Sequence, residues 1–350
     1  MRIDYELKLD FDDVLIRPKR SESPSRAAVV LRRDYEFLNS GQTWGGIPII
    51  ASNMDTVGTL SMARALHPEM MTCLHKYYSE ESLLDFFRSE ELRQSVFFTL
   101  GIQDSELEKL RAVHRRVRLK HVCIDAANGY TKYFVQWVQR VREEFPELTI
   151  MAGNVATPEM VQELLITGAA DIVKIGIGPG SVCTTRVKTA VGYPQLSAII
   201  ECADAAHGLR GHVCADGGCR TPGDVVKALA AGADYVMLGG MLAGHDECEG
   251  EWIERDGRRV AMKFYGMSSA TAMEKYAGGL KNYRAAEGRE TTVPWRGPVA
   301  ATIQEISGGI RSACAYVGAD RLKDLSKCTT FVLCRRPPGV VSHGTAMLGG

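Results

Sequence analysis

One of the ten cysteines is placed like a nucleophile. Cys183 lies in a polar loop, Gly-Pro-Gly-Ser-Val-Cys-Thr-Thr-Arg (178–186), whose turn residues keep it out of a strand or helix core. The nearby Arg186 and backbone dipoles could lower its thiol pKa from the reference of about 8.5, which would raise the fraction of reactive thiolate. The loop therefore predicts covalent catalysis by Cys183; the alternative is a small, half-buried residue with no chemical role. The same loop could also turn its carbonyls inward and hold a monovalent cation.

Three glycine-rich segments follow apolar runs and could bind an anion. They begin at Gly176, at Asp216-Gly217-Gly218 and at Gly239-Gly240, and Ser181 adds a hydroxyl donor to the first. Glycine lets bare backbone amides approach a phosphate, although each glycine could instead serve a turn with positive φ. Three such segments together favour phosphate binding.

The elements that must position these loops alternate between strand and helix. Apolar or β-branched runs predict eight strands, at 47–51, 70–74, 96–100, 121–125, 149–153, 172–176, 212–216 and 235–239. Helical patterns lie between them, at 60–66, 80–89, 105–117, 130–144, 158–167, 195–206 and 222–231. Eight such units predict an α/β protein built as a (β/α)8 TIM barrel, whose active site lies in the loops after the strands. A doubly wound sheet is the fallback, but no Gly-x-Gly-x-x-Gly follows the first strand.

The chain of 350 residues is expected to form a single barrel domain with three additions. The first is an N-terminal extension over about 1–45. The second is an excursion inserted after the eighth strand, 241–298, in which 247–259 reads as an exposed hairpin with a central Asp-Gly. A last helix is predicted at 299–317, and the tail at 335–350 is predicted to be disordered.

Composition excludes several classes of function. Lys and Arg number 42 and Asp and Glu number 42, so no excess positive charge favours nucleic acid or an anionic membrane surface. No apolar run is long enough to cross a membrane, and no signal peptide is recognised, so a cytoplasmic protein is expected. The scattered cysteines fit reduced thiols. Zinc at His121 and Cys123, or at His212 and Cys214, is a weak alternative because no second ligand pair follows.

Several longer motifs resemble those of the IMP dehydrogenase and GMP reductase family. They extend from Leu9-Asp-Phe-Asp-Asp-Val-Leu-Ile-Arg-Pro18 to Ser312-Ala-Cys-Ala-Tyr-Val-Gly318 and so cover nearly the whole chain. Between them lie Gly176-Ile-Gly-Pro-Gly-Ser-Val-Cys-Thr-Thr-Arg186, Asp216-Gly-Gly218, Met237-Leu-Gly-Gly-Met-Leu-Ala-Gly244, Phe264-Tyr-Gly-Met-Ser-Ser269 and Tyr283-Arg-Ala-Ala-Glu-Gly288. In the family, the excursion after the eighth strand forms a flap.

Within that family, the resemblance favours the reductase branch. Dehydrogenases usually carry inserted regulatory domains, for which the stretch after Cys73-Leu-His-Lys76 leaves no room, and they use an Arg-Tyr dipeptide to activate water, which this sequence lacks. The flap motifs and Gly192-Tyr-Pro-Gln195 are similar to those of reductases. The implied activity is NADPH-dependent reductive deamination of GMP to IMP and ammonia, a step of purine nucleotide salvage. A dehydrogenase without its regulatory domains and a non-catalytic phosphate-binding barrel are the alternatives.

The resemblance also implies roles for individual residues. The implied catalytic residues are Cys183, which attacks purine C2, and Thr185 and Glu287, which help to protonate the departing amine. The implied substrate-binding residues are Ser181, Asp216, Gly217, Gly218, Gly239, Gly240, Gly266, Met267, Ser268, Arg284, Ala285, Ala286 and Gly288. The implied cofactor-binding residues are Lys76, Asp125, Ala126, Ala127, Ile177, Gly178, Met267, Tyr283 and Arg284, with Ser25, Arg26, Ser312, Ala313, Cys314 and Ala315 further away in sequence.

Two further expectations come from the family. A potassium ion would lie among backbone carbonyls of Gly178, Gly180, Cys183 and Arg186, and the chain would form a homotetramer in which Ser25 and Arg26 reach a neighbour's cofactor. Several assignments also have a plain structural interpretation. Asp125 and Asp216 could satisfy amides at strand ends, Glu287 could be a solvated loop charge, and Lys76 could pair with a surface acid.

Overall fold

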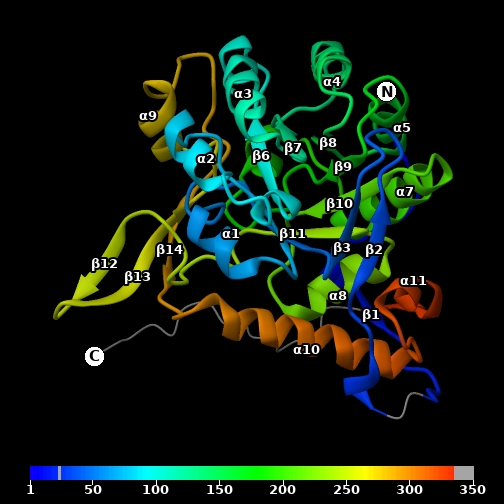
Figure 1. The fold of residues 1–350 in the computed structure, drawn as a ribbon. Coiled ribbons are helices and arrows are strands. Elements are labelled where there is room, and N and C mark those ends of the chain that lie inside the picture. The colour runs from blue at the N-terminus through cyan, green and yellow to red at the C-terminus, as the bar shows by residue number, and fades with distance from the viewer. Residues whose placement is uncertain (23–24, 335–350) are drawn as a thin grey trace.

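The eight apolar runs form the strands of a closed parallel barrel (Figure 1), as the sequence predicts. The computed structural model describes residues 1–22 and 25–334, so the predicted disordered tail lies outside the described residues. Around the barrel the strand order is β10-β11-β4-β5-β6-β7-β8-β9. The strands are β4 (Ile49–Ala51), β5 (Met71–Cys73), β6 (Val96–Leu100), β7 (His121–Asp125), β8 (Thr149–Val155), β9 (Ile172–Ile175), β10 (His212–Asp216) and β11 (Tyr235–Leu238).

Helices follow the strands and cover the outside of the barrel. They are α1 (Leu60–Leu66), α2 (Glu80–Phe86), α3 (Asp104–Val117), α4 (Lys132–Glu144), α5 (Pro158–Ile166), α7 (Gln195–Gly208), α8 (Pro222–Ala230) and α10 (Val299–Val317). Several begin where the sequence supplies a cap. The Thr59, Ser79 and Thr131 side chains each accept a backbone N–H from the first turn. Pro158 and Pro222 occupy first-turn positions, where a missing N–H costs nothing.

Smaller elements extend the barrel. An N-terminal strand β1 (Val14–Ile16) pairs with β15 (Phe331–Leu333), and β2 (Arg33–Glu36) pairs with β3 (Thr43–Gly46). The excursion forms a three-stranded sheet of β12 (Trp252–Arg255), β13 (Arg258–Tyr265) and β14 (Glu290–Pro294), together with α9 (Ala270–Ala277). The predicted hairpin is therefore confirmed, with the Asp256-Gly257 turn between β12 and β13. The remaining short helices are α6 (Thr185–Thr189), α11 (Leu325–Cys328), η1 (Phe11–Asp13), η2 (Arg26–Ala28), η3 (Leu92–Gln94) and η4 (Leu322–Asp324).

The interior of the barrel is packed with side chains. One layered cluster combines strand residues such as Met71, Phe97 and Met151 with aromatic residues from the β2–β3 hairpin. Tyr35 of that hairpin stacks on Tyr235 with ring centroids 4.5 Å apart. In a barrel filled in this way, the substrate site is expected in the loops at the carboxyl ends of the strands.

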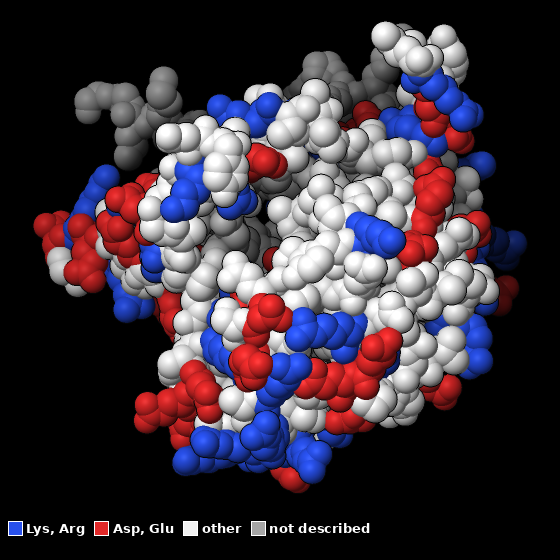
Figure 2. Space-filling model, turned by 90° about the horizontal axis from the view of Figure 1, so that it is seen from above, with Lys and Arg blue, Asp and Glu red and all other residues white. Residues whose placement is uncertain are grey.

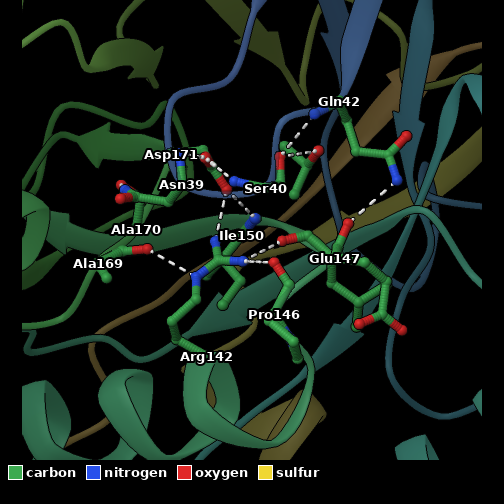
Figure 3. A network of polar contacts seen from close by, with 12 residues as sticks. Asn39, Ser40, Gln42, Arg142, Pro146, Glu147, Ile150, Ala169, Ala170 and Asp171 are labelled. Atoms are coloured by element: carbon green, nitrogen blue, oxygen red, sulfur yellow. Dashed lines mark hydrogen bonds and ion pairs between the residues drawn. The ribbon is translucent and has the colours of Figure 1, made fainter.

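A buried ion pair ties the amino-terminal end of the barrel together (Figure 3). Arg142 of α4 donates to Asp171 at 2.6 Å and to the carbonyls of Ala169, Pro146 and Leu148. The Asp171 carboxylate, which has no exposed surface, also accepts the backbone N–H groups of Asn39, Ser40 and Ile150. This network joins the loop after β2, the α4 helix, the start of β8 and the residue before β9.

The described residues include no helix that is both long and apolar enough to cross a membrane. Figure 2 shows one face of the molecule, where basic and acidic side chains are interspersed around a central hollow. This mixture of charges agrees with the absence of a net charge in the sequence.

Candidate active site

A cavity of about 430 Å³ opens at the carboxyl ends of the barrel strands. Many of the predicted site residues line it together: Lys76, Asp125, Ala126, Ala127, Ile177, Gly178, Gly180, Cys183, Thr185, Asp216, Gly217, Gly266, Met267, Ser268 and Glu287. Its size falls within the range of roughly 300 to 1,000 Å³ that small-molecule sites usually have.

Cys183, Thr185 and Glu287 form a chain of hydrogen bonds in this cavity. The Cys183 Sγ lies 3.3 Å from Thr185 Oγ1, and the Thr185 hydroxyl donates to Glu287 Oε2 at 2.7 Å. A carboxyl group is thereby linked to a half-buried thiol through a single hydroxyl. Such a chain can carry a proton between the carboxyl group and an atom bound beside the sulfur.

The excursion delivers Glu287 to the cysteine loop by backbone pairing. The Thr184 N–H donates to the Glu287 carbonyl at 2.8 Å, and the Glu287 N–H donates to Ser268 at 3.0 Å. Cys183 and Gly288 form an antiparallel β-bridge. Because a Cβ at Gly288 would lie 2.8 Å from the Ser269 nitrogen, only glycine permits this close approach.

A buried lysine organises two carboxylates at the bottom of the cavity. Lys174 Nζ lies 2.5 Å from Asp125 Oδ1 and 3.1 Å from Asp216 Oδ2. Burial works against the charge on Lys174, but the two carboxylates outweigh it and hold its pKa above the usual value. In the same way burial alone would raise the pKa of Asp125, and Lys174 reverses the direction. Asp216 also accepts from Asn154 Nδ2 at 2.9 Å, so its orientation is defined by two donors.

A second, half-buried lysine also lines the cavity. Lys76 Nζ lies 2.8 Å from Glu106 Oε1 at the start of α3, and the carboxylate outweighs the effect of burial, so the pKa of Lys76 is raised. Lys76 stays protonated and can interact with an anionic group of a ligand. Lys76 therefore pairs with an acid, as one interpretation of the sequence expected, but the acid is Glu106 of the cavity wall and not a surface residue.

Arg186 is directed toward a different partner than the sequence suggested. Its guanidinium donates to Asp10 Oδ2 at 3.0 Å and to the Tyr193 carbonyl, so it forms an ion pair with the N-terminal segment.

Burial raises the pKa of Cys202 to about 12 and that of Cys314 to about 11, which makes both thiols unreactive near neutral pH. Cys183 differs from both because it is only half-buried and lines the cavity.

The predicted phosphate loops border a second cavity of about 220 Å³, beside the first. Ser181 and Gly240 line it and lie close together, since a Cβ added to Gly240 would lie 3.1 Å from Ser181 Oγ. Gly217 and Gly218 adopt φ of 89° and 90°, a region that favours glycine. A Cβ on Gly239 would lie 2.9 Å from the Met54 sulfur, so bulk is excluded there as well.

Other predicted residues lie apart from both cavities. Tyr283, Arg284 and Ala285 are exposed, whereas Ala286 and Gly288 are half-buried beside Glu287. The remaining predicted cofactor residues cluster elsewhere: Ser312 and Ala313 line a separate cavity of about 470 Å³ on α10, and Arg26 lies over the neighbouring Tyr316 ring. The side chain of Cys314 is buried in the core and is not available to a ligand.

Two of the four backbone carbonyls predicted to bind a cation already accept hydrogen bonds within the chain. The Gly180 carbonyl accepts the Cys183 N–H at 3.1 Å, and the Arg186 carbonyl accepts the Ala190 N–H at 3.1 Å. Each of these two carbonyls already accepts one hydrogen bond within the chain and keeps a second lone pair, and the cation site stays a prediction. Over residues 1–22 and 25–334, no three His, Cys, Asp or Glu side chains are grouped as metal ligands.

Sequence reasoning missed several residues of the cavity wall. Tyr77, Gln103, Glu106 and Lys174 all line it. Lys174 carried a signal, since it is a lysine in the middle of the apolar run Ile-Val-Lys-Ile, and a buried lysine needs carboxylate partners. Glu106 carried none, because a glutamate in the first turn of a helix is common.

Comparison with known proteins places the whole chain in one family. The family model of the IMP dehydrogenase / GMP reductase domain matches residues 8–337. GMP reductase of Edwardsiella ictaluri (strain 93-146) is 57% identical over 336 residues, covering 95% of this chain and 96% of that protein. GMP reductase 1 of Homo sapiens is 57% identical over 334 residues (95% and 96%), and GMP reductase of Phytophthora infestans is 57% identical over 334 residues (95% and 92%). The chain therefore belongs to the IMP dehydrogenase / GMP reductase family.

Proposed function

We propose that this protein reduces GMP to IMP and ammonia with NADPH as the reductant. The observation that carries the proposal is the hydrogen-bonded chain from Cys183 through Thr185 to Glu287, in a cavity of nucleotide size. Relatives named GMP reductase, at 57% identity over 95% of the chain, support the substrate.

In the proposed first step, the Cys183 thiol passes its proton through Thr185 to the Glu287 carboxylate, and the resulting thiolate attacks purine C2 of GMP. The exocyclic amine is a poor leaving group until it is protonated, and Glu287 supplies that proton through the Thr185 hydroxyl. Ammonia leaves with the electron pair of its C–N bond, and a covalent thioimidate joins Cys183 to the purine. Dividing the substitution into two steps lowers the barrier that a direct displacement would face.

In the second step, C2 gains a hydride and the Cys183 thiolate departs, which gives IMP. NADPH supplies that hydride when it is bound. The residues that would hold it are Lys76, Asp125, Ala126, Ala127 and Gly178, which line the same cavity as Cys183.

The ribose of GMP would lie against Asp216, which Asn154 and Lys174 hold in place. Gly266, Met267 and Ser268 would enclose the base from the excursion side. A potassium ion at the cysteine loop, a homotetramer and a cytoplasmic role in purine salvage belong to the same proposal, supported by resemblance to the family.

The runner-up activity is oxidation of IMP by a dehydrogenase. It requires an activated water, and the sequence contains no Arg-Tyr dipeptide of the kind that dehydrogenases use for that purpose. A phosphate-binding barrel without catalysis would leave the link between Cys183 and Glu287 without a role.

Replacement of the nucleophile tests the proposal. We expect Cys183→Ala to abolish turnover of GMP and to leave GMP binding within a few-fold of wild type, because the phosphate loops and Asp216 hold the nucleotide. Cys202→Ala, at a buried thiol outside the cavity, is the matched control and should retain activity. Since a tenfold loss corresponds to only about 1.4 kcal/mol, more than roughly a tenth of wild-type activity in Cys183→Ala would show that the thiol is not the nucleophile.

A further inference from the structure

Two arginines of the excursion enclose the second cavity, where the phosphate loops meet. Arg289 precedes β14 and Arg296 follows it, and both line the 220 Å³ cavity together with Ser181 and Gly240. Thr291 and Val293 line it too, so alternate residues of β14 face the cavity, as the two-residue period of a strand requires. One face of this strand thus forms a wall opposite the phosphate loops.

The arginines contact the same backbone segments that carry the predicted phosphate donors. Arg289 donates to the Ser181 carbonyl through Nε at 3.1 Å and Nη2 at 2.8 Å. Arg296 donates through Nη1 to the Met241 carbonyl at 3.0 Å and to the Gly240 carbonyl at 3.5 Å. Backbone carbonyl oxygens repel an anion, so covering them with guanidinium groups makes these loops more favourable to phosphate.

The charge of these two arginines is not neutralised inside the protein. A third arginine of the cavity, Arg220, pairs with Asp12, but neither Arg289 nor Arg296 has a carboxylate within 4.0 Å among residues 1–22 and 25–334. The chain carries no net charge, so this pair is a local concentration of positive charge. Two uncompensated guanidinium groups around a small cavity favour an anion with two negative charges.

We infer that Arg289 and Arg296 determine specificity for a nucleoside 5′-monophosphate over the nucleoside, by placing two positive charges at the phosphate loops. This inference rests on the proposed function, because it assigns the second cavity to the phosphate of the same substrate. Both arginines lie on the excursion, so phosphate binding would also draw β14 against the loop that carries Cys183.

The test compares the binding of GMP and guanosine by titration calorimetry in wild type, Arg289→Met, Arg296→Met and the double variant. Each single substitution should weaken GMP binding by roughly tenfold to a hundredfold and leave guanosine binding unchanged. Arg289→Lys should recover part of the affinity, since it keeps the charge but loses the paired contact to Ser181. Arg258→Met, at the exposed tip of the excursion sheet, is the matched control and should change neither affinity.

Thermal unfolding of each variant shows whether it folds, and Arg→Gln replaces any methionine variant that does not. GMP affinities within twofold of wild type in the arginine variants, while wild type reduces GMP, would overturn this inference and leave the proposed function standing. A wild-type protein that reduces GMP but binds it no better than guanosine would also overturn the inference, whereas a wild-type protein that does not reduce GMP would count against the proposed function itself. An equal loss of GMP and guanosine affinity would show that the arginines only maintain the loop structure, and it too would overturn the inference.

Discussion

The substitution Glu287→Gln separates proton transfer from positioning at the proposed active site. Glutamine has nearly the shape of glutamate, and its amide oxygen can still accept the Thr185 hydroxyl, which now donates to Glu287 Oε2 at 2.7 Å. The backbone bonds from Thr184 to the Glu287 carbonyl and from Glu287 to Ser268 are unaffected. The variant therefore keeps the geometry of the site and loses only the group that can hold a mobile proton.

The expected loss follows from that single difference. General acid catalysis contributes roughly 10² to 10⁴ in rate, or about 2.7 to 5.4 kcal/mol of transition-state stabilisation. Ammonia release should fall by that factor, whereas hydride exchange between IMP and the cofactor should remain close to wild type because no amine is protonated in it. Thr185→Val interrupts the same chain, so the double variant should lose little more than either single variant.

Two half-reactions measure this directly. Ammonia release from GMP is followed in a coupled assay, and the exchange half-reaction is followed by isotope transfer between labelled NADPH and NADP⁺ in the presence of IMP. Glu274→Gln, on the exposed side of α9, controls for a change of charge in the excursion. Equal damage to both half-reactions in Glu287→Gln would refute the proton-transfer role and make Glu287 a substrate-positioning residue.

Two further predictions concern the stability of the barrel. Arg142→Met should lower the free energy of unfolding by about 3 kcal/mol, which is the lower end for breaking a buried ion pair. The loss stays at that end because Asp171 keeps its three backbone donors. A free energy of unfolding from chemical denaturation that lies within about 1 kcal/mol of wild type would contradict this prediction. At Asp234, burial alone would raise the carboxyl pKa, but the hydrogen bond with His207 at 2.9 Å and the His212 imidazole, 3.6 Å away, outweigh it and lower the pKa. Asp234 in turn outweighs the burial of His212 and raises the pKa of that imidazole. The stabilisation from Asp234 is therefore present above the unfolded-state pKa of aspartate, about 3.9, and is lost as the pH falls further. The stabilisation from His212 is present below the unfolded-state pKa of histidine, about 6.5, and is lost as the pH rises through the folded-state pKa of His212. The difference in unfolding free energy between wild type and Asp234→Asn should be largest between about pH 4 and 6.5, and a difference that does not vary with pH would refute the coupling.

The barrel itself was predictable because its signals are local. Each buried strand is a short apolar run, and each following helix begins at a recognisable cap or proline, as at Thr221 and Pro222. The first strand was predicted to begin at Ile47 but begins at Ile49. Pro48 lies between them, and proline has no N–H to donate to a neighbouring strand.

The excursion was less predictable because its pairing is not local. The strand β14 has the polar sequence Glu-Thr-Thr-Val-Pro and becomes a strand by pairing with β13, more than two dozen residues earlier in the chain. The helix α9 was also missed, although Ser269 caps it by accepting from the Ala272 N–H. The glycines and charges around both elements indicated an irregular loop.

Site residues near the carboxyl ends of strands could be predicted from the barrel pattern, whereas site residues elsewhere could not. Asp125 and Asp216 end strands β7 and β10, and Cys183 lies in the loop after β9, so barrel geometry alone brings them together. Glu287 lies about a hundred residues beyond Cys183, and only family resemblance linked the two. Lys174 was overlooked because its strand reads as apolar, although its carboxylate partners were both identified.

The most direct measurement of the central claim follows both possible reactions of the purified protein. With GMP and NADPH, the proposal predicts loss of absorbance at the reduced-nicotinamide band, with IMP and ammonia formed in equal amounts. With IMP and NAD⁺, it predicts no XMP, because the chain lacks the Arg-Tyr pair that would activate water for hydrolysis. Steady formation of XMP from IMP and NAD⁺, without ammonia release from GMP, would contradict the proposal.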